Sequence, residues 1–213
     1  MRRILVSDAS VMVPEVIRVV CDKYLDDGHQ RRHQEQVVET ALLVFDLLAG
    51  NYQLTAGERR LLECSARLHD IGHFISEQRH DLHSQYLILQ DENMNVLPQE
   101  IRGLLALIAG GHRKTPRGEL RQYPREKRQR ILQLMSLLRF ADALDYTRQT
   151  NELLDIVTVR RGKLVLSLKQ EVSEEFEARL LKRSRLLKKA FGLKLSIEPP
   201  ASEVQVSSAV STS

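Results

Sequence analysis

The stretch Leu68-His69-Asp70-Ile71-Gly72-His73 follows an apolar helical run, residues 61–67, and it poses the central question about this chain. A histidine and an aspartate stand together at the inner end of that run. Burying an ionised carboxylate without a partner costs several kcal/mol or shifts its pKa until it is neutral. A divalent cation removes this cost, because imidazole nitrogen and carboxylate oxygen are both good ligands. A single His-Asp pair is weak evidence for a metal site. The inference therefore requires further ligands from other helices.

Composition indicates a soluble globular protein of one or two domains, which we expect in the cytoplasm. The chain has 213 residues, of which 42% are apolar and 28% are charged, so it can bury a sizeable core. No apolar run approaches the ~20 residues of a membrane span, and the apolar stretch near Met1 is too short for a signal peptide. Cys21 and Cys64 lie in apolar helical patterns and are expected to be buried free thiols.

The periodicity of apolar residues divides the chain into two parts. Helices are expected over 14–24 and 29–48, in the run that leads into His69, from His83, from Pro98 and over 125–146. After Thr150, alternation over 157–168 predicts a β-hairpin, the spacing over 176–191 predicts a helix capped by Gly192, and 193–197 predicts a third strand. The predicted fold class is therefore mainly α. A helical bundle covers 14–150, a small β-β-α-β subdomain covers 153–199, and a flexible tail covers 201–213.

Several polar residues interrupt apolar helical faces and are therefore candidate ligands. His33 shares a face with Val37 and Ala41, and His112 ends the stripe of the helix that begins at Pro98. Asp142 continues the stripe of its helix better than Asp145, although periodicity alone does not separate the two. A lone histidine on such a face is more often a hydrogen-bonded core residue. All seven histidines fall between residues 29 and 112, however, and this clustering favours a site. The inward candidates are His33, His69, Asp70, His83, His112 and Asp142.

Two segments are strongly basic. Residues 113–130 carry eight basic and two acidic side chains and form either a solvated surface or an anion-attracting rim beside the site. Arg113 and Lys114 directly follow His112 and could bind phosphate oxygens, while Arg139 could do the same or be a structural partner. The basic face over 179–189 could bind a polyanion, form a homodimer contact or be solvated. With few aromatic residues and no recognition motif, nucleic acid is not favoured as a partner.

Four motifs, "LHDIGHFIS", "HSQYLIL", "HRK" and "LLRFADALD", resemble the C-terminal HD region of the exopolyphosphatase and guanosine pentaphosphate phosphatase family. The order His, His-Asp, His, His, Asp is the pattern of the HD superfamily of metal-dependent phosphohydrolases. The likeness covers roughly residues 14–199 and implies an HD-domain helical bundle. By resemblance, His33, His69, Asp70 and Asp142 would hold one metal, and His83 and His112 a second, with Asp70 bridging. The resemblance thus gives His69 and Asp70 catalytic roles, with one or two divalent ions (Mn, Fe, Ni, Co or Zn, with Mg as a further candidate) as cofactors.

The resemblance does not carry the family's activity with it. In that family the catalytic half is an N-terminal actin-like fold with glycine-rich phosphate loops, and these 213 residues contain none of it. The chain is therefore expected to be the HD half standing alone. The favoured function is a metal-dependent phosphohydrolase, a phosphatase or phosphodiesterase acting on a nucleotide or another phosphate ester. The alternative is a non-catalytic binding or regulatory module for polyphosphate, an alarmone nucleotide or another polyanion.

Overall fold

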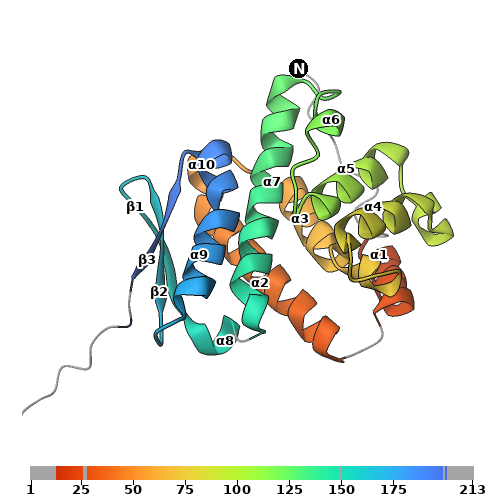
Figure 1. Ribbon diagram of the computed structural model, residues 1–213. Coiled ribbons are helices and arrows are strands. Elements are labelled where there is room, and N and C mark those ends of the chain that lie inside the picture. The colour runs from red at the N-terminus through yellow and green to blue at the C-terminus, as the bar shows by residue number, and fades with distance from the viewer. Residues whose placement is uncertain (1–12, 26–27, 149, 199, 201–213) are drawn as a thin grey trace, which may run out of the picture.

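The structure is a computed structural model that describes residues 13–25, 28–148, 150–198 and 200 (Figure 1). The tail predicted over 201–213 lies outside the described residues. Among the described helices, none is long and apolar enough to cross a membrane. The fold class is confirmed: helices make up most of the chain, and a small sheet lies near the C-terminal end.

The first part of the chain is helical, and its helices begin where local chemistry favours them. Thr55 caps its helix with the complete capping box that its spacing to Glu58 predicts, and Pro98 and Pro124 occupy the caps of two others. The α-helices are α1 (Val13–Tyr24), α2 (Gly28–Tyr52), α3 (Ala56–Leu68), α4 (His80–Gln90), α5 (Gln99–Gly110), α6 (Arg117–Leu120), α7 (Arg125–Leu144) and α8 (Thr150–Leu153). Short 3₁₀ turns connect some of them: η1 (Ile71–Phe74), η2 (Glu92–Val96) and η3 (Asp145–Thr147).

The C-terminal part has the predicted β-β-α-β order. Strands β1 (Leu154–Arg160) and β2 (Lys163–Leu168) form an antiparallel hairpin, and β3 (Lys194–Glu198) pairs with β2 in parallel. Between β2 and β3 the chain forms α9 (Glu174–Arg183) and α10 (Arg185–Phe191), two helices where the sequence predicted one. The break falls at Ser184, whose hydroxyl donates a hydrogen bond to the carbonyl of Leu180 at 2.7 Å. Gly192 ends α10 at φ 74°, as predicted for a left-handed cap.

Helix α7 lies at the centre of the molecule, between the sheet with α9 and α10 on one side and α3 to α5 on the other (Figure 1). A single cluster of buried apolar residues joins α2, α5 and α7 to β1, β2, α9 and α10. A second cluster lies between α1, α3, α4 and α5. The polar ends of α2, α3, α5 and α7 are therefore held by two apolar cores, and these ends carry the candidate ligands.

Candidate metal centre

The loop after α3 is held against the start of α4 by one serine and one glycine. The Ser84 hydroxyl accepts a hydrogen bond from the Gly72 amide at 2.8 Å and donates one to the His69 carbonyl at 2.6 Å. A Cβ atom on Gly72 would lie 2.1 Å from the His80 carbonyl oxygen, so only glycine permits this approach. The loop that carries His69 and Asp70 is thereby fixed beside the first turn of α4.

The first group of candidate ligands is formed by His33 of α2, His69 after α3 and Asp142 of α7. Nε2 of His33 lies 3.3 Å from Nε2 of His69 and 3.6 Å from Oδ1 of Asp142. Nε2 of His69 lies 3.9 Å from the same Asp142 oxygen. Two ligand atoms that share a metal at about 2.1 Å are separated by about 3.0–3.4 Å at tetrahedral or octahedral angles. The spacing in this group is therefore close to that of a metal ligand set.

The second group is formed by Asp70, His80 of α4 and His112 after α5. Nε2 of His80 lies 3.0 Å from Nε2 of His112 and 3.4 Å from Oδ1 of Asp70. Asp70 also reaches the first group, because its Oδ2 lies 3.4 Å from Nε2 of His33 and its Oδ1 3.4 Å from Nε2 of His69. Its two oxygens thus lie between the groups, in the bridging position that the resemblance implied.

The structure brings five of the six sequence candidates together and puts His80 where His83 was expected. His83 belongs to neither group of ligand atoms among the described residues. His80 and Ser84 are four residues apart on α4, so they share the face that meets the His69-Asp70 loop. We therefore replace His83 by His80 in the candidate ligand set.

Hydrogen bonds behind the histidines direct each Nε2 atom into the centre. Nδ1 of His69 bonds to the Ala66 carbonyl at 2.7 Å, and Nδ1 of His112 bonds to the Ala109 carbonyl at 2.7 Å. Nδ1 of His80 bonds to the Glu77 carbonyl at 3.1 Å. Such partners fix the tautomer and ring orientation of metal-ligating histidines.

Asp145 and His73 are two further residues of the centre that periodicity did not assign. Oδ2 of Asp145 accepts a hydrogen bond from Nδ1 of His33 at 2.6 Å, so Asp145 lies behind the ligand whereas Asp142 faces the centre. His73 stacks on His80 with ring centroids 3.9 Å apart, and its Nε2 lies 3.7 Å from Oδ2 of Asp70. The only sequence signal for His73 was its place within the quoted motif.

Burial and the neighbouring aspartates shift the pKa values of two histidines of the centre in opposite directions. Burial would lower the pKa of His33, but Asp142, Asp145 and Asp70 outweigh it and raise that pKa to about 11. Burial lowers the pKa of His112 to about 4, so this imidazole is neutral at pH 7. Three aspartates therefore surround His33, and a centre rich in buried carboxyl groups favours additional positive charge.

The aspartates are ionised despite their burial. Burial would raise the pKa of Asp70, but His69, His33 and His112 hold it well below its usual value. Burial would likewise raise the pKa of Asp142, yet His33, His112 and His69 lower it to about 2. Oδ1 of Asp70 is buried and accepts no hydrogen bond from the described residues. A buried, ionised oxygen that has no hydrogen-bond partner among the described residues and faces imidazole nitrogens fits a divalent cation, so these clusters could bind metal.

Comparison with known proteins agrees with this arrangement. The family described as Ppx/GppA phosphatase, domain III, matches residues 27–193, which include every candidate ligand. The chain belongs to the Ppx/GppA domain III family. No curated protein matches the chain closely enough to add to this result.

In this Ppx/GppA domain III chain, the basic segment divides into two parts. Arg113 and Lys114 are exposed directly after His112. Farther along, Lys127 pairs with Glu100, and Nε of Arg130 lies 3.5 Å from Oε1 of Glu58. Lys127 and Arg130 are therefore engaged in surface contacts, whereas Arg113 and Lys114 adjoin a candidate ligand.

Arg139 makes structural contacts, one of the two alternatives that the sequence left open. Its guanidinium donates hydrogen bonds to the Gly111 carbonyl and, at 3.3 Å, to the Thr115 hydroxyl, which makes it a structural partner of the segment around His112. Burial and, to a smaller extent, Arg183 lower the pKa of Arg139 to about 10, while Asp142 opposes this change. Nε of Arg139 is buried and has no hydrogen-bond partner in the described residues.

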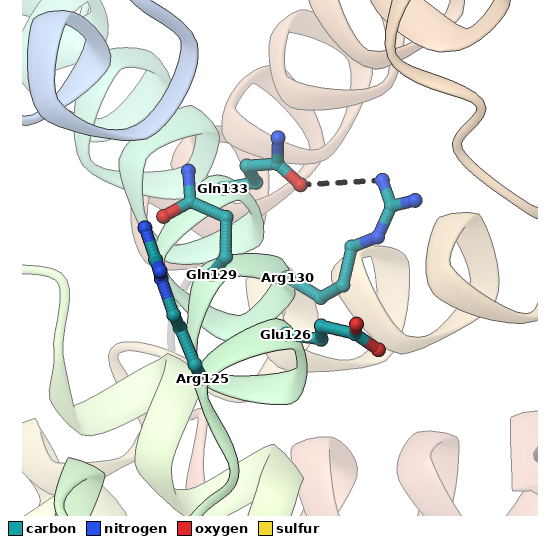
Figure 2. Close-up of a pocket in the computed structure, with 5 residues that line it drawn as sticks. All are labelled: Arg125, Glu126, Gln129, Arg130 and Gln133. Carbon is teal, nitrogen blue, oxygen red and sulfur yellow. Dashed lines mark hydrogen bonds between the residues drawn. The ribbon is translucent and has the colours of Figure 1, made fainter.

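A cavity of about 610 Å³ lies on the first half of α7 and is separate from the centre (Figure 2). It is lined by Arg125, Glu126, Gln129, Arg130 and Gln133. Gln133 and Asp142 are nine residues apart, which is about 13 Å along the helix. Gln129 donates a hydrogen bond to the Ala190 carbonyl at 2.6 Å, and Arg130 donates one to the Tyr52 carbonyl at 2.8 Å. These side chains hold α10 and the end of α2 against α7.

Proposed function

We propose that this chain is a metal-dependent phosphohydrolase that acts on a phosphate ester of a small molecule such as a nucleotide. The observation that carries the proposal is Asp70, whose two oxygens lie between two groups of histidine ligands at distances of 3.4 Å. Membership of a phosphatase family supports the reaction class. A module that only binds anions has no need for five converging imidazole and carboxylate ligands beside a sixth, bridging one.

The candidate ligands would hold metal in two groups, and nearby basic residues would bind the substrate. Asp70 would bind in both groups, with His33, His69 and Asp142 on one side and His80 and His112 on the other. Mn, Fe, Co, Ni and Zn suit such mixed nitrogen and oxygen ligands, and Mg is a further candidate. When bound, such cations supply charge stabilisation for a phosphoryl transition state and lower the pKa of a water molecule. Arg113 and Lys114, beside His112, would bind phosphate oxygens.

The test combines metal analysis with an activity screen. Protein purified without chelator should carry one or two transition-metal ions per chain, and Asp70→Ala should lose them. The metal-loaded protein should then hydrolyse small phosphate esters, and chelator should abolish turnover. Asp155→Ala removes an exposed aspartate and serves as the control, with metal content and turnover unchanged.

The competing function is a regulatory module that binds a polyanion without turnover. A native protein free of metal that also takes up neither Mn nor Fe under anaerobic loading would contradict the hydrolase. So would metal-loaded protein that turns over none of a broad set of phosphate esters and binds polyphosphate tightly.

A further inference from the structure

His112 lies in a turn after α5, and the carbonyl groups on both sides of it accept hydrogen bonds from arginines of other helices. Arg139 of α7 donates to the Gly111 carbonyl, one residue before His112. Arg183, the last residue of α9, donates to the Arg113 carbonyl at 2.9 Å, one residue after His112. The turn that carries this candidate ligand is therefore held by α7 on one side and by the C-terminal part of the chain on the other.

Arg183 reaches this turn because α9 is anchored beside α7 (Figure 1). Phe176 and Leu180 of α9 are buried in the apolar cluster that includes the buried residues of α7. Arg183 lies seven residues after Phe176 and three after Leu180, so the three side chains share one helical face. The apolar face of α9 thus fixes the helix, and Arg183 continues that face to its polar end.

The hydrogen bond from Arg183 supports the second group of ligands and not the first. In the first group, His33 is held by Asp145, and the loop that carries His69 is held by Ser84. Within the described part of the chain, no hydrogen bond joins Arg183 to any of these residues. Arg183 therefore contacts the backbone beside one candidate ligand, while the ligands of the first group have other supports.

We propose that Arg183 is a positioning residue of the metal centre, which acts through the Arg113 carbonyl to fix His112 and with it the second group of ligands. This inference rests on the proposed function, and it adds a residue of the C-terminal part of the chain to the support of that site. A turn is more mobile than a helix, whereas metal ligands have to be held within about 0.5 Å of their positions. Loss of the hydrogen bond should therefore weaken the second group and leave the first intact.

The charge of Arg183 makes this role distinguishable from an electrostatic one. Burial lowers the pKa of Arg183, and Asp142 opposes this change, so the guanidinium lies within the electrostatic reach of the centre. A positive charge at this place repels a bound cation. Its removal would, by electrostatics alone, strengthen metal binding in both groups. A loss of affinity in Arg183→Ala therefore reports on the hydrogen bond and not on the charge.

The proposal is tested by calorimetric titration of the chelator-treated protein with Mn. Asp142→Ala and His80→Ala identify the binding steps of the first and the second group, because each variant removes a ligand of one group. Arg183→Ala should weaken the second step about tenfold, the lower end of the usual effect of losing a group that holds a metal ligand, and leave the first step within about twofold. Arg183→Lys keeps a charged donor and should stay within about threefold of wild type in both steps.

Lys182→Ala is the matched control, because Lys182 is exposed on the same helix and carries the same charge as Arg183. Both of its Mn-binding steps should stay within about twofold of wild type, since exposed charges contribute little. A second step that is unchanged or tighter in Arg183→Ala overturns the positioning role. Equal weakening of both steps does so as well, because a general loss of structure would act on both groups.

A second measurement requires no metal. Nδ1 of His112 and Nδ1 of His69 each donate a hydrogen bond to a carbonyl of the preceding helix at 2.7 Å, so their imidazole N–H signals in NMR spectra form a matched pair. In the metal-free protein, Arg183→Ala should broaden the His112 signal and leave the His69 signal sharp. Two signals that both match wild type would show that Arg183 does not position His112. Selective broadening in a protein that takes up no metal, or that turns over no phosphate ester, supports the role of Arg183 and contradicts only the proposed function.

Discussion

Nδ1 of His33 donates a hydrogen bond to Oδ2 of Asp145 at 2.6 Å, and this pair links the start of α2 to the end of α7. Asp145 is itself held, because its Oδ1 accepts hydrogen bonds from the Thr150 hydroxyl at 2.6 Å and the Thr150 amide at 3.2 Å. The carboxylate thus orients a candidate ligand and leaves Nε2 of His33 directed at Asp70 and Asp142. Removing its charge should weaken metal binding without removing a ligand.

Asp145→Asn should therefore lower the metal affinity about 10–100-fold, the usual effect of losing a partner behind a metal-ligating histidine. Titration of the chelator-treated protein with Mn or Zn measures this change. Asp155→Asn, which alters an exposed aspartate on β1, should leave the affinity unchanged. An unaltered affinity in Asp145→Asn would show that the hydrogen bond to His33 does not support the centre.

His80→Ala and His83→Ala distinguish the ligand set of the structure from the set that the sequence implied. His80 lies 3.0 Å from the Nε2 atom of His112, whereas His83 joins neither ligand group. His80→Ala should lose one metal ion per chain or bind it at least tenfold more weakly. His83→Ala should keep the wild-type metal content. Elemental analysis of both variants, purified in parallel, measures the metal content of each. Loss of metal in His83→Ala but not in His80→Ala would make His83 the ligand.

Gly72→Ala should disrupt the loop that carries His69 and Asp70. The added methyl group would lie 2.1 Å from the His80 carbonyl and 2.4 Å from the Ser84 amide, so backbone has to move. We expect a loss of about 2–4 kcal/mol in the free energy of unfolding, measured by urea denaturation, together with a loss of bound metal.

The control for this variant is Gly50→Ala, in the last turns of α2, where a Cβ atom meets nothing within 4 Å. Alanine there should be neutral or stabilise the protein by up to about 1 kcal/mol, because it favours the helix. A Gly72→Ala protein with the stability and metal content of wild type would contradict the close approach of the loop to α4.

Asp91 should make the stability of the protein depend on pH between about 4 and 2. Burial would raise the pKa of Asp91, but hydrogen bonds from Lys23, Tyr24 and Asn93 lower it to about 2. A carboxyl whose pKa is lowered in the folded state stabilises that state above its unfolded pKa of 3.8, and this contribution is lost as the pH falls through about 2. The loss should amount to roughly 2 kcal/mol.

Urea denaturation at several pH values tests this expectation through the variant Asp91→Asn. Other carboxyl groups also titrate in this range, so the informative quantity is the difference between variant and wild type. The wild-type advantage at pH 5 should shrink as the pH approaches 2. A difference that is independent of pH would show that Asp91 is not stabilised by ionisation.

Much of the centre could be predicted because helical periodicity reports which face of a helix is buried. His33, His112 and Asp142 each continue an apolar stripe, and the structure brings all three to the same place. The choice between Asp142 and Asp145 could not be made this way. Both residues lie at the inner end of α7, and their side chains differ in direction, one toward the centre and one toward Nδ1 of His33.

His80 could not be predicted because the segment before it has no period. Helix α4 begins only after Arg79, whose left-handed φ of 56° is uncommon for a residue other than glycine and is not indicated by the residue type.

The apolar cluster shared by α2, α7, β2, α9 and α10 has a consequence for truncated variants of this chain. Removing the segment after Thr150 would expose fully buried side chains of α7, such as Leu137 and Phe140, to water. A fragment that ends there should aggregate or lose the cooperative unfolding of the whole chain, so its metal content would report on a damaged protein. Point variants in the uncut 213-residue chain are therefore the sound way to assign roles to the candidate ligands.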